Sequence, residues 1–431
     1  MIRDSFYILS TRLVVIFINF VTLVLLARIL GVEVFGAYSI VILIPNLLFL
    51  CLSLGLNTST IYSISRYQDE KEIFITQVLL FGLLWGILGS TFFIILSETL
   101  IPSLSFTDLL SNSSLYIIVA TTLLLIKYYQ DAILQALGKF NLFNKSLLLQ
   151  SFSALVLILF AFILNRLTLE IALLIFIVST TLGIVVSFMG IYTYVKPALI
   201  FSGSYLLERL KYGFGAFISQ LCMVMLYRVD IVMLDYMTAL TVVGVYVLSA
   251  RLIEMIWLIP DSVGLILFPK LMAKNEDKLA LIVTTNRVLL LITVLSIIIS
   301  ALAIYPFILL FFGGEYKESV VLFLYLLPGT VFISLFKVLS RWFNSEGLTA
   351  PIACITLIFL LLNILFNLML IPDYEAFGAA LSSLLCYIGL GTSILIMFYR
   401  KHRNISIMDI IMPTTTDIKK GMFFLTSKLN R

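Results

Sequence analysis

Twelve stretches of the 431-residue chain are each apolar and long enough to cross a lipid bilayer, and this pattern limits the possible folds most strongly. Backbone groups in hydrocarbon must be satisfied within the segment, so the stretches predict α-helices and not strands. They cover residues 6–29, 36–56, 73–97, 112–136, 146–165, 169–194, 212–236, 243–268, 287–312, 319–341, 351–371 and 377–399. We therefore expect an all-α integral membrane protein with about twelve transmembrane helices.

Composition supports this class. The chain is 61% hydrophobic and 12% charged, whereas soluble domains average about 45–50% and about 25%. A water-soluble fold cannot hide so much apolar surface, which excludes soluble enzymes, nucleic-acid-binding proteins, disordered chains and collagen-like fibres.

The distribution of lysine and arginine predicts the orientation. With a cytoplasmic N-terminus, twenty of the 28 basic residues fall in cytoplasmic segments and only three in outer ones. Positively charged loops stay inside, so we expect both termini in the cytoplasm and a basic cytoplasmic tail at 401–431.

Three pairs of glycines suggest an internal repeat. Gly36 and Gly244, Gly138 and Gly347, and Gly183 and Gly391 are each separated by 208 or 209 residues. Each pair occupies the same place in its half of the chain. We therefore predict an N-terminal six-helix lobe at 1–205 and a C-terminal six-helix lobe at 206–400, the organisation of transporters with internal repeats.

Basic residues inside the predicted helices are the main candidates for a binding site. A charge at a helix centre costs at least about 2.5–3.5 kcal/mol, so it usually faces a polar interior and has a function. Five residues qualify as candidates for contact with an anionic substrate: Arg12, Lys127, Arg228, Arg251 and Lys337. For Arg12 the alternative is a side chain that snorkels to the headgroups. Lys337 and Arg341 lie four residues apart with no acid between them, and are predicted to form a local cationic patch at the cytoplasmic mouth.

Acids near these bases suggest ion pairs. Asp131 follows Lys127 by four residues and lies beside it on a helix. It either neutralises Lys127 or forms a pair that a phosphate or a proton opens. Arg228 could pair with Glu254, or Asp230 with Arg251, as a clamp, an outer gate or a ligand site. Asp131, Glu254 and Asp230 are thus candidates for ion coupling or gating.

Neutral polar residues on the same helices are candidates for sugar contacts: Asn19, Tyr128, Asn363 and Asn367. The two asparagines on residues 351–371 could instead hold helices together. The three tryptophans, Trp85, Trp257 and Trp342, could stack on sugars, although Trp commonly marks the membrane interface.

Catalytic and metal-binding patterns are missing. The four cysteines lie in apolar stretches and His402 is the single histidine, so no metal site or disulfide is predicted. There is no phosphate-binding G-x-x-x-x-G-K-[ST] motif and no loop long enough for an active site. We expect a transporter without a cofactor, and not an enzyme.

Short motifs spread over residues 1–400 resemble those of polysaccharide flippases. Residues 27–31 (ARILG) and 35–38 (FGAY) resemble the opening of the O-antigen transporter group in the multidrug/oligosaccharidyl-lipid/polysaccharide exporter superfamily. Further matches follow in order at 55–56, 66, 135–140, 228–230, 243–246, 250–252, 268–269, 370–372 and 378–380.

This resemblance implies an inner-membrane carrier. It would move undecaprenyl-diphosphate-linked oligosaccharide units from the cytoplasmic leaflet to the periplasmic or outer leaflet by alternating access, among membrane lipids. Its partners would include the polysaccharide polymerase and the chain-length machinery, and no nucleic acid. The alternative is a cation-coupled multidrug exporter of the same superfamily. Such an exporter needs an acidic cavity, whereas here five intramembrane bases face five acids: Asp131, Asp230, Asp235, Glu254 and Asp261.

Overall fold

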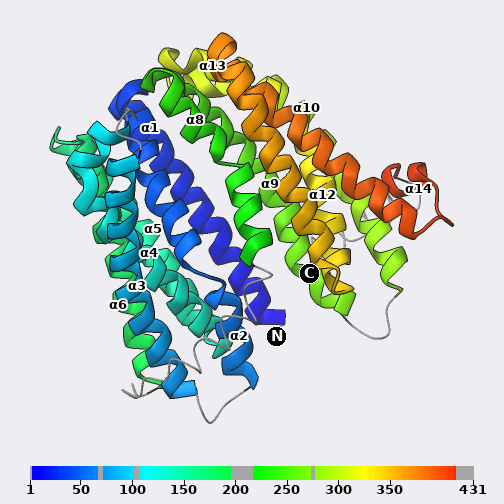
Figure 1. Ribbon diagram of the computed structural model, residues 1–431, viewed down its shortest axis with the longest axis horizontal. Coiled ribbons are helices and arrows are strands. Elements are labelled where there is room, and N and C mark those ends of the chain that lie inside the picture. The colour runs from blue at the N-terminus through cyan, green and yellow to red at the C-terminus, as the bar shows by residue number, and fades with distance from the viewer. Residues whose placement is uncertain (1, 67–70, 101–105, 196–216, 273–276, 414–431) are drawn as a thin grey trace. The chain divides into compact units, whose positions relative to one another are not determined.

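The computed structural model describes residues 2–66, 71–100, 106–195, 217–272 and 277–413. These residues are almost entirely helical and contain no strand (Figure 1). Eight helices are long and apolar enough to cross a membrane, and two pairs of helices joined at a bend pass the same test together. The predicted all-helical membrane fold is confirmed.

Two of the eight helices are far longer than one crossing requires. Helices α1 (Ile2–Leu52) and α13 (Thr349–Lys401) contain 51 and 53 residues, whereas one crossing needs about 20. Each has one residue with non-helical backbone near its middle, Gly31 in α1 and Glu375 in α13. If α1 and α13 are each counted as two spans and each bent pair as one, the described residues contain the predicted twelve spans.

The chain separates into two compact units, Met1–Leu221 and Cys222–Arg431. The predicted lobe boundary at residue 205 falls within residues 196–216, which lie outside the described residues. Most of the predicted basic tail, residues 414–431, also lies outside them.

The first unit contains α1, α2 (Leu56–Arg66), α3 (Lys71–Leu100), α4 (Phe106–Ala136), α5 (Phe140–Ile163) and α6 (Leu169–Tyr192). Helix α4 packs against α3, α6 and α1. Its inward side chains join a core that includes Phe74, Leu125 and Tyr129. The second predicted span ends earlier than expected, at Leu52, and the separate helix α2 occupies a stretch that the sequence analysis treated as a connection.

The chain passes from the first unit to the second within a broken span, in which the helix Phe217–Leu226 and α8 (Val229–Met237) meet at 43°. Helices α9 (Leu240–Met272) and α10 (Lys278–Phe311) follow. The short helix η2 (Gly314–Tyr316) and α11 (Lys317–Leu326) form the next broken span with α12 (Gly329–Ser345), bent by 53°. Pro328 lies at this bend and favours it, because proline has no backbone N–H to donate to the preceding helical turn. Helix α12 packs against α9, α10 and α13.

The paired glycines have matching roles in the two units. Gly138 after α4 and Gly347 after α12 both adopt a left-handed backbone, with φ of 67° and 74°, which glycine tolerates best. Gly183 and Gly391 lie where another helix approaches. A Cβ atom at Gly183 would lie 3.3 Å from Lys127 Cε, and one at Gly391 would lie 2.6 Å from the carbonyl oxygen of Phe332.

The first residues of the predicted tail are ordered against the second unit. Ser406 caps the short helix α14 (Ile407–Ile411) by accepting a hydrogen bond from the backbone of Asp409. Asn286 on α10 donates to the carbonyl oxygen of Ile410 at 2.9 Å, and Arg287 donates to that of Asp409. Residues 406–411 therefore form a strap on α10.

Candidate functional site

In the first unit, the predicted neighbours Lys127 and Asp131 on α4 form an ion pair. The Lys127 side chain is 6% exposed and that of Asp131 is 18% exposed. Lys127 fits there because Gly183 on α6 leaves room for its aliphatic chain. One base thus meets one acid inside this unit.

Neutral hydrogen bonds surround this pair. Gln150 on α5 donates to Thr180 on α6 at 3.2 Å, and its side chain also lies beside Gly183. Ser146 on α5 donates to the carbonyl oxygen of Gly183 at 2.8 Å. Contacts of this kind hold spanning helices together, so Lys127 and Asp131 belong to the polar contact that joins α4, α5 and α6.

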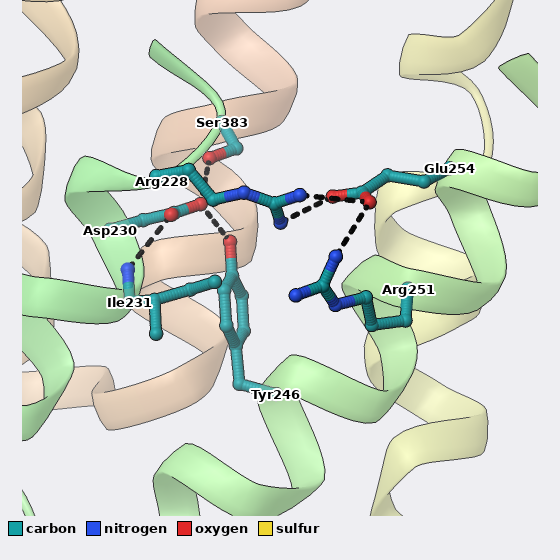
Figure 2. Close-up of polar contacts among 7 residues, drawn as sticks. All are labelled: Arg228, Asp230, Ile231, Tyr246, Arg251, Glu254 and Ser383. Atoms are coloured by element: carbon teal, nitrogen blue, oxygen red, sulfur yellow. Dashed lines mark hydrogen bonds and ion pairs between the residues drawn. The ribbon is translucent and has the colours of Figure 1, made fainter. Parts of the chain in front are cut away.

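In the second unit, Glu254 on α9 lies between two arginines (Figure 2). Arg228, at the break before α8, donates to both carboxylate oxygens at 2.5 and 3.0 Å. Arg251, one turn before Glu254, approaches the same carboxylate at 3.5 Å. Two bases therefore share one acid, and the Arg251 side chain is the more exposed of the two at 38%, against 17% for Arg228.

Asp230 has neutral partners rather than Arg251. Figure 2 shows its carboxylate accepting hydrogen bonds from the hydroxyls of Tyr246 and Ser383. The backbone amide of Ile231 donates to its other oxygen at 2.8 Å. Of the two predicted pairings across the helical hairpin, the structure thus contains Arg228–Glu254. A carboxylate at the start of a helix is also stabilised by the helix dipole.

Lys337 on α12 has an acidic partner that the local sequence does not reveal. Its Nζ atom lies 2.6 Å from Asp261 on α9. No acid lies between Lys337 and Arg341 in the sequence. The acidic partner is 76 residues away and reaches Lys337 through the packing of α9 on α12. Arg341, one turn further along α12, lies against Gly264 of α9.

These charges form one continuous group, which we call the basic cluster. Lys337 is close enough to Glu254 and Arg341 to interact with both electrostatically, and Asp230 interacts with Arg228 in the same way. The cluster comprises four bases and three acids: Arg228, Arg251, Lys337, Arg341, Asp230, Glu254 and Asp261. Bases exceed acids in a membrane-spanning region, so the cluster can bind an anion.

Aromatic side chains pack beside the basic cluster. The rings of Tyr227 and Trp257 lie 4.7 Å apart, and Tyr387 on α13 packs edge-on against both. Lys337 Nζ lies 5.3 Å from the centre of the Trp257 ring, in cation–π geometry. Tyr227 and Tyr387 were not among the residues predicted from the sequence. The spacing of Arg251, Glu254, Trp257 and Asp261 along one helix face could have indicated part of this group.

The other candidates lie apart from this cluster or play a different part. Arg12 and Asn19 are exposed on α1. Tyr128 is half-buried and packs edge-on against Phe49. Asn363 and Asn367 on α13 are buried and hydrogen-bonded to each other at 2.9 Å. Within the described ranges, no three His, Cys, Asp or Glu side chains are grouped so that they could hold a metal ion.

A comparison with protein families identifies the family of this protein. Residues 1–274 match the family described as polysaccharide biosynthesis protein. The chain belongs to this family. No curated protein matches the sequence.

Solved structures show the fold that this member of the family shares. The chain is similar to the lipid II flippase MurJ in an inward closed conformation, with a TM-score of 0.76 and 15% identity over 95% of this chain and 89% of that one. It is also similar to an inward-facing multidrug resistance MATE transporter of the MOP superfamily, with a TM-score of 0.72 and 14% identity over 91% and 94%. A MOP transporter from Pyrococcus furiosus, described as having a binding pocket of reverse polarity, matches with a TM-score of 0.67 and 15% identity over 95% of both chains.

Proposed function

We propose that the protein is a flippase for lipid-linked oligosaccharides in a bacterial inner membrane. It would carry undecaprenyl-diphosphate-linked repeat units for O-antigen, capsule or exopolysaccharide from the cytoplasmic leaflet to the other leaflet by alternating access. The single observation that carries this proposal is the excess of bases in the basic cluster. Membership in the polysaccharide biosynthesis family supports it, as does the likeness to a lipid II flippase.

The physical task explains why such a cluster is needed. A diphosphate cannot cross about 30 Å of hydrocarbon unaided, because a buried charge without partners is very costly. Arginines that share a carboxylate can exchange part of that contact for phosphate oxygens, and arginine fits phosphate in a bidentate geometry. The membrane potential would assist, since moving an anion out of a negative cytoplasm is favoured by about 2.3 kcal/mol per charge and 100 mV.

Within the cluster, Arg251 is the first candidate for the phosphate contact. Its side chain is the most exposed of the three bases for which ion pairs are present, at 38% against 17% for Arg228 and 13% for Lys337. Arg228 already donates to both oxygens of Glu254, so we assign it to holding that carboxylate in place.

A multidrug exporter is the less favoured function. Organic cations need a site in which acids exceed bases, because a desolvated like charge is repelled. The basic cluster has the opposite balance.

The proposal is tested by Arg251→Gln. The loss of a charge-assisted hydrogen bond of about 1.5–3 kcal/mol should lower transport about 10- to 100-fold. The measurement is flipping of an undecaprenyl-diphosphate-linked oligosaccharide in proteoliposomes, together with surface polysaccharide in cells. Lys317→Gln, at an exposed base on α11, is the matched control and should transport normally. Normal flipping by Arg251→Gln would overturn the role given to Arg251. A wild type that flips no lipid-linked oligosaccharide, but exports dye, would overturn the proposal in favour of drug export.

A further inference from the structure

Two hydrogen-bond donors beside the basic cluster have no partner among the residues that the structure describes. The hydroxyl of Tyr227 and the Nε1–H of Trp257 are buried, and neither makes a hydrogen bond with any residue that the structure describes. Trp257 is only 5% exposed. A buried donor without a partner costs about 1–3 kcal/mol, so such groups are uncommon and need an explanation.

The two donors lie together, next to the charges proposed to bind the diphosphate. Their rings are 4.7 Å apart. Tyr227 directly precedes Arg228 at the break before α8, and Trp257 follows Glu254 by three residues on α9, which puts it on the same helix face. Lys337 Nζ lies 5.3 Å from the Trp257 ring centre and 6.0 Å from that of Tyr227.

Other buried hydroxyls in this unit do have partners. Tyr246 and Ser383 both donate to Asp230, and Ser319 donates to the carbonyl oxygen of Val245 at 2.8 Å. The packing of the second unit is therefore able to satisfy its hydroxyls. Several side-chain amides and the ring of His402 in this unit also have a buried atom without a partner among the described residues. Tyr227 and Trp257 differ from these in that two donors lie side by side, next to the basic cluster.

The chemistry of these donors fits a neutral, oxygen-rich group. An indole N–H can only donate, and a phenol donates readily at neutral pH. Lys337, whose Nζ atom lies beside both rings, is already paired with Asp261 at 2.6 Å. Phosphate is better placed on the arginines, while hydroxyl, ring or amide oxygens suit two uncharged donors.

We propose that Tyr227 and Trp257 form a subsite for the sugar that is attached to the diphosphate, and donate to its oxygens. This inference rests on the proposed flippase function, because it needs the diphosphate on the neighbouring arginines. It adds that the second unit binds the first sugar as well as the charged linkage.

The test compares the wild type with Tyr227→Phe/Trp257→Phe, which removes both donors and keeps aromatic rings. Thermal unfolding of purified protein is measured alone, with undecaprenyl diphosphate, and with undecaprenyl diphosphate carrying one glucose or one N-acetylglucosamine. Ligand binding raises the unfolding temperature in proportion to the logarithm of occupancy. We expect both proteins to respond equally to undecaprenyl diphosphate, while only the wild type binds a sugar-bearing lipid about 10-fold more tightly than the bare one.

Two single variants check the claim about unpaired donors. Tyr227→Phe should unfold at the wild-type temperature or above it, since its hydroxyl has no protein partner to lose. Tyr246→Phe is the matched control and should unfold earlier, because its hydroxyl binds Asp230.

The outcomes separate this inference from the proposed function. A sugar effect that survives in the double variant, or is missing in the wild type, overturns the inference alone. A weaker response of the double variant to bare undecaprenyl diphosphate also overturns it, because the donors would then bind phosphate. A wild type that responds to none of the lipids overturns the proposed function and this inference with it.

Discussion

The polar interiors of the two units differ in how their charges are balanced. In the first unit, Lys127 meets Asp131 one to one, and neutral hydrogen bonds surround the pair. In the second unit, Arg228 and Arg251 share Glu254, while Lys337 pairs with Asp261 beside Arg341. A balanced pair within one helix can hold a fold together without a ligand. An excess of bases leaves a net positive charge, which an anionic ligand would neutralise under the proposed function.

The kind of base sharpens this contrast. A guanidinium cannot lose its proton in a protein, so an arginine inside the membrane stays charged whatever happens to its partner. A carboxylate left alone in hydrocarbon can take up a proton and become neutral. The stability of the second unit should therefore depend more on Glu254 than the stability of the first unit depends on Lys127.

The largest effect is expected from Glu254→Gln, which leaves two arginines without their carboxylate. Breaking a fully buried pair costs about 3–5 kcal/mol. The Glu254 side chain is 23% exposed, so we expect a loss of about 2–3 kcal/mol in the free energy of unfolding. Chemical unfolding in detergent, followed by circular dichroism, measures it. Glu318→Gln, at an exposed acid on α11, should change little. Equal stability of both variants would show that the arginines do not depend on Glu254.

A smaller effect is expected from Lys127→Met, about 1–2 kcal/mol, because Asp131 can become neutral. The double variant Lys127→Met/Asp131→Leu should regain the lost stability, since replacing both members of a buried pair with apolar groups is often neutral or favourable. We expect it to keep flipping lipid-linked oligosaccharide in proteoliposomes. A stable double variant that does not transport would instead assign Lys127 to the transport path and remove the contrast between the units.

The smallest effect concerns an ion pair at the ends of two spans, between Lys278 at the start of α10 and Glu346 just after α12, whose side chains are 36% and 35% exposed. A hydrogen bond from Lys278 at 2.9 Å holds the pKa of Glu346 below its ordinary value. A lowered carboxylate pKa adds stability above the ordinary pKa of about 4.3, and the gain is lost as pH falls. At neutral pH, the free energy of unfolding of the wild type should exceed that of Glu346→Gln by less than about 1 kcal/mol. The difference should disappear in acid, as pH-dependent unfolding would show. A difference that persists in acid would mean that the charge of Glu346 is not its cause.

The fold was largely predictable because each span has its own signal. Twenty apolar residues in a row specify a helix wherever they pack, and the bend at Pro328 follows from its missing amide hydrogen. The break at Tyr227 and Arg228 contains neither proline nor glycine, so no local feature indicates it. It depends on the packing of α8 against α13 and α9.

The site was predictable only over short sequence distances. Lys127 and Asp131 are four residues apart on one helix, so their pairing followed from the sequence. Arg228 and Glu254 lie on consecutive spans, so the sequence offered their pairing, but only as one of two alternatives. Lys337 and Asp261 belong to spans that are not adjacent in the chain. Their pairing, and the packing of Tyr227 on Trp257, require the tertiary arrangement of α9, α12 and α13.

The strap at residues 406–411 has a practical consequence for handling the protein. Ile410 is fully buried, and its carbonyl oxygen accepts the hydrogen bond from Asn286. A truncation before Ser406 would uncover an apolar patch on α10 and strand a buried amide. Affinity tags, fluorescent fusions and shortened versions should therefore leave the chain intact through Met412. A shorter version would express poorly because this contact is lost, whatever the stability of the rest of the protein.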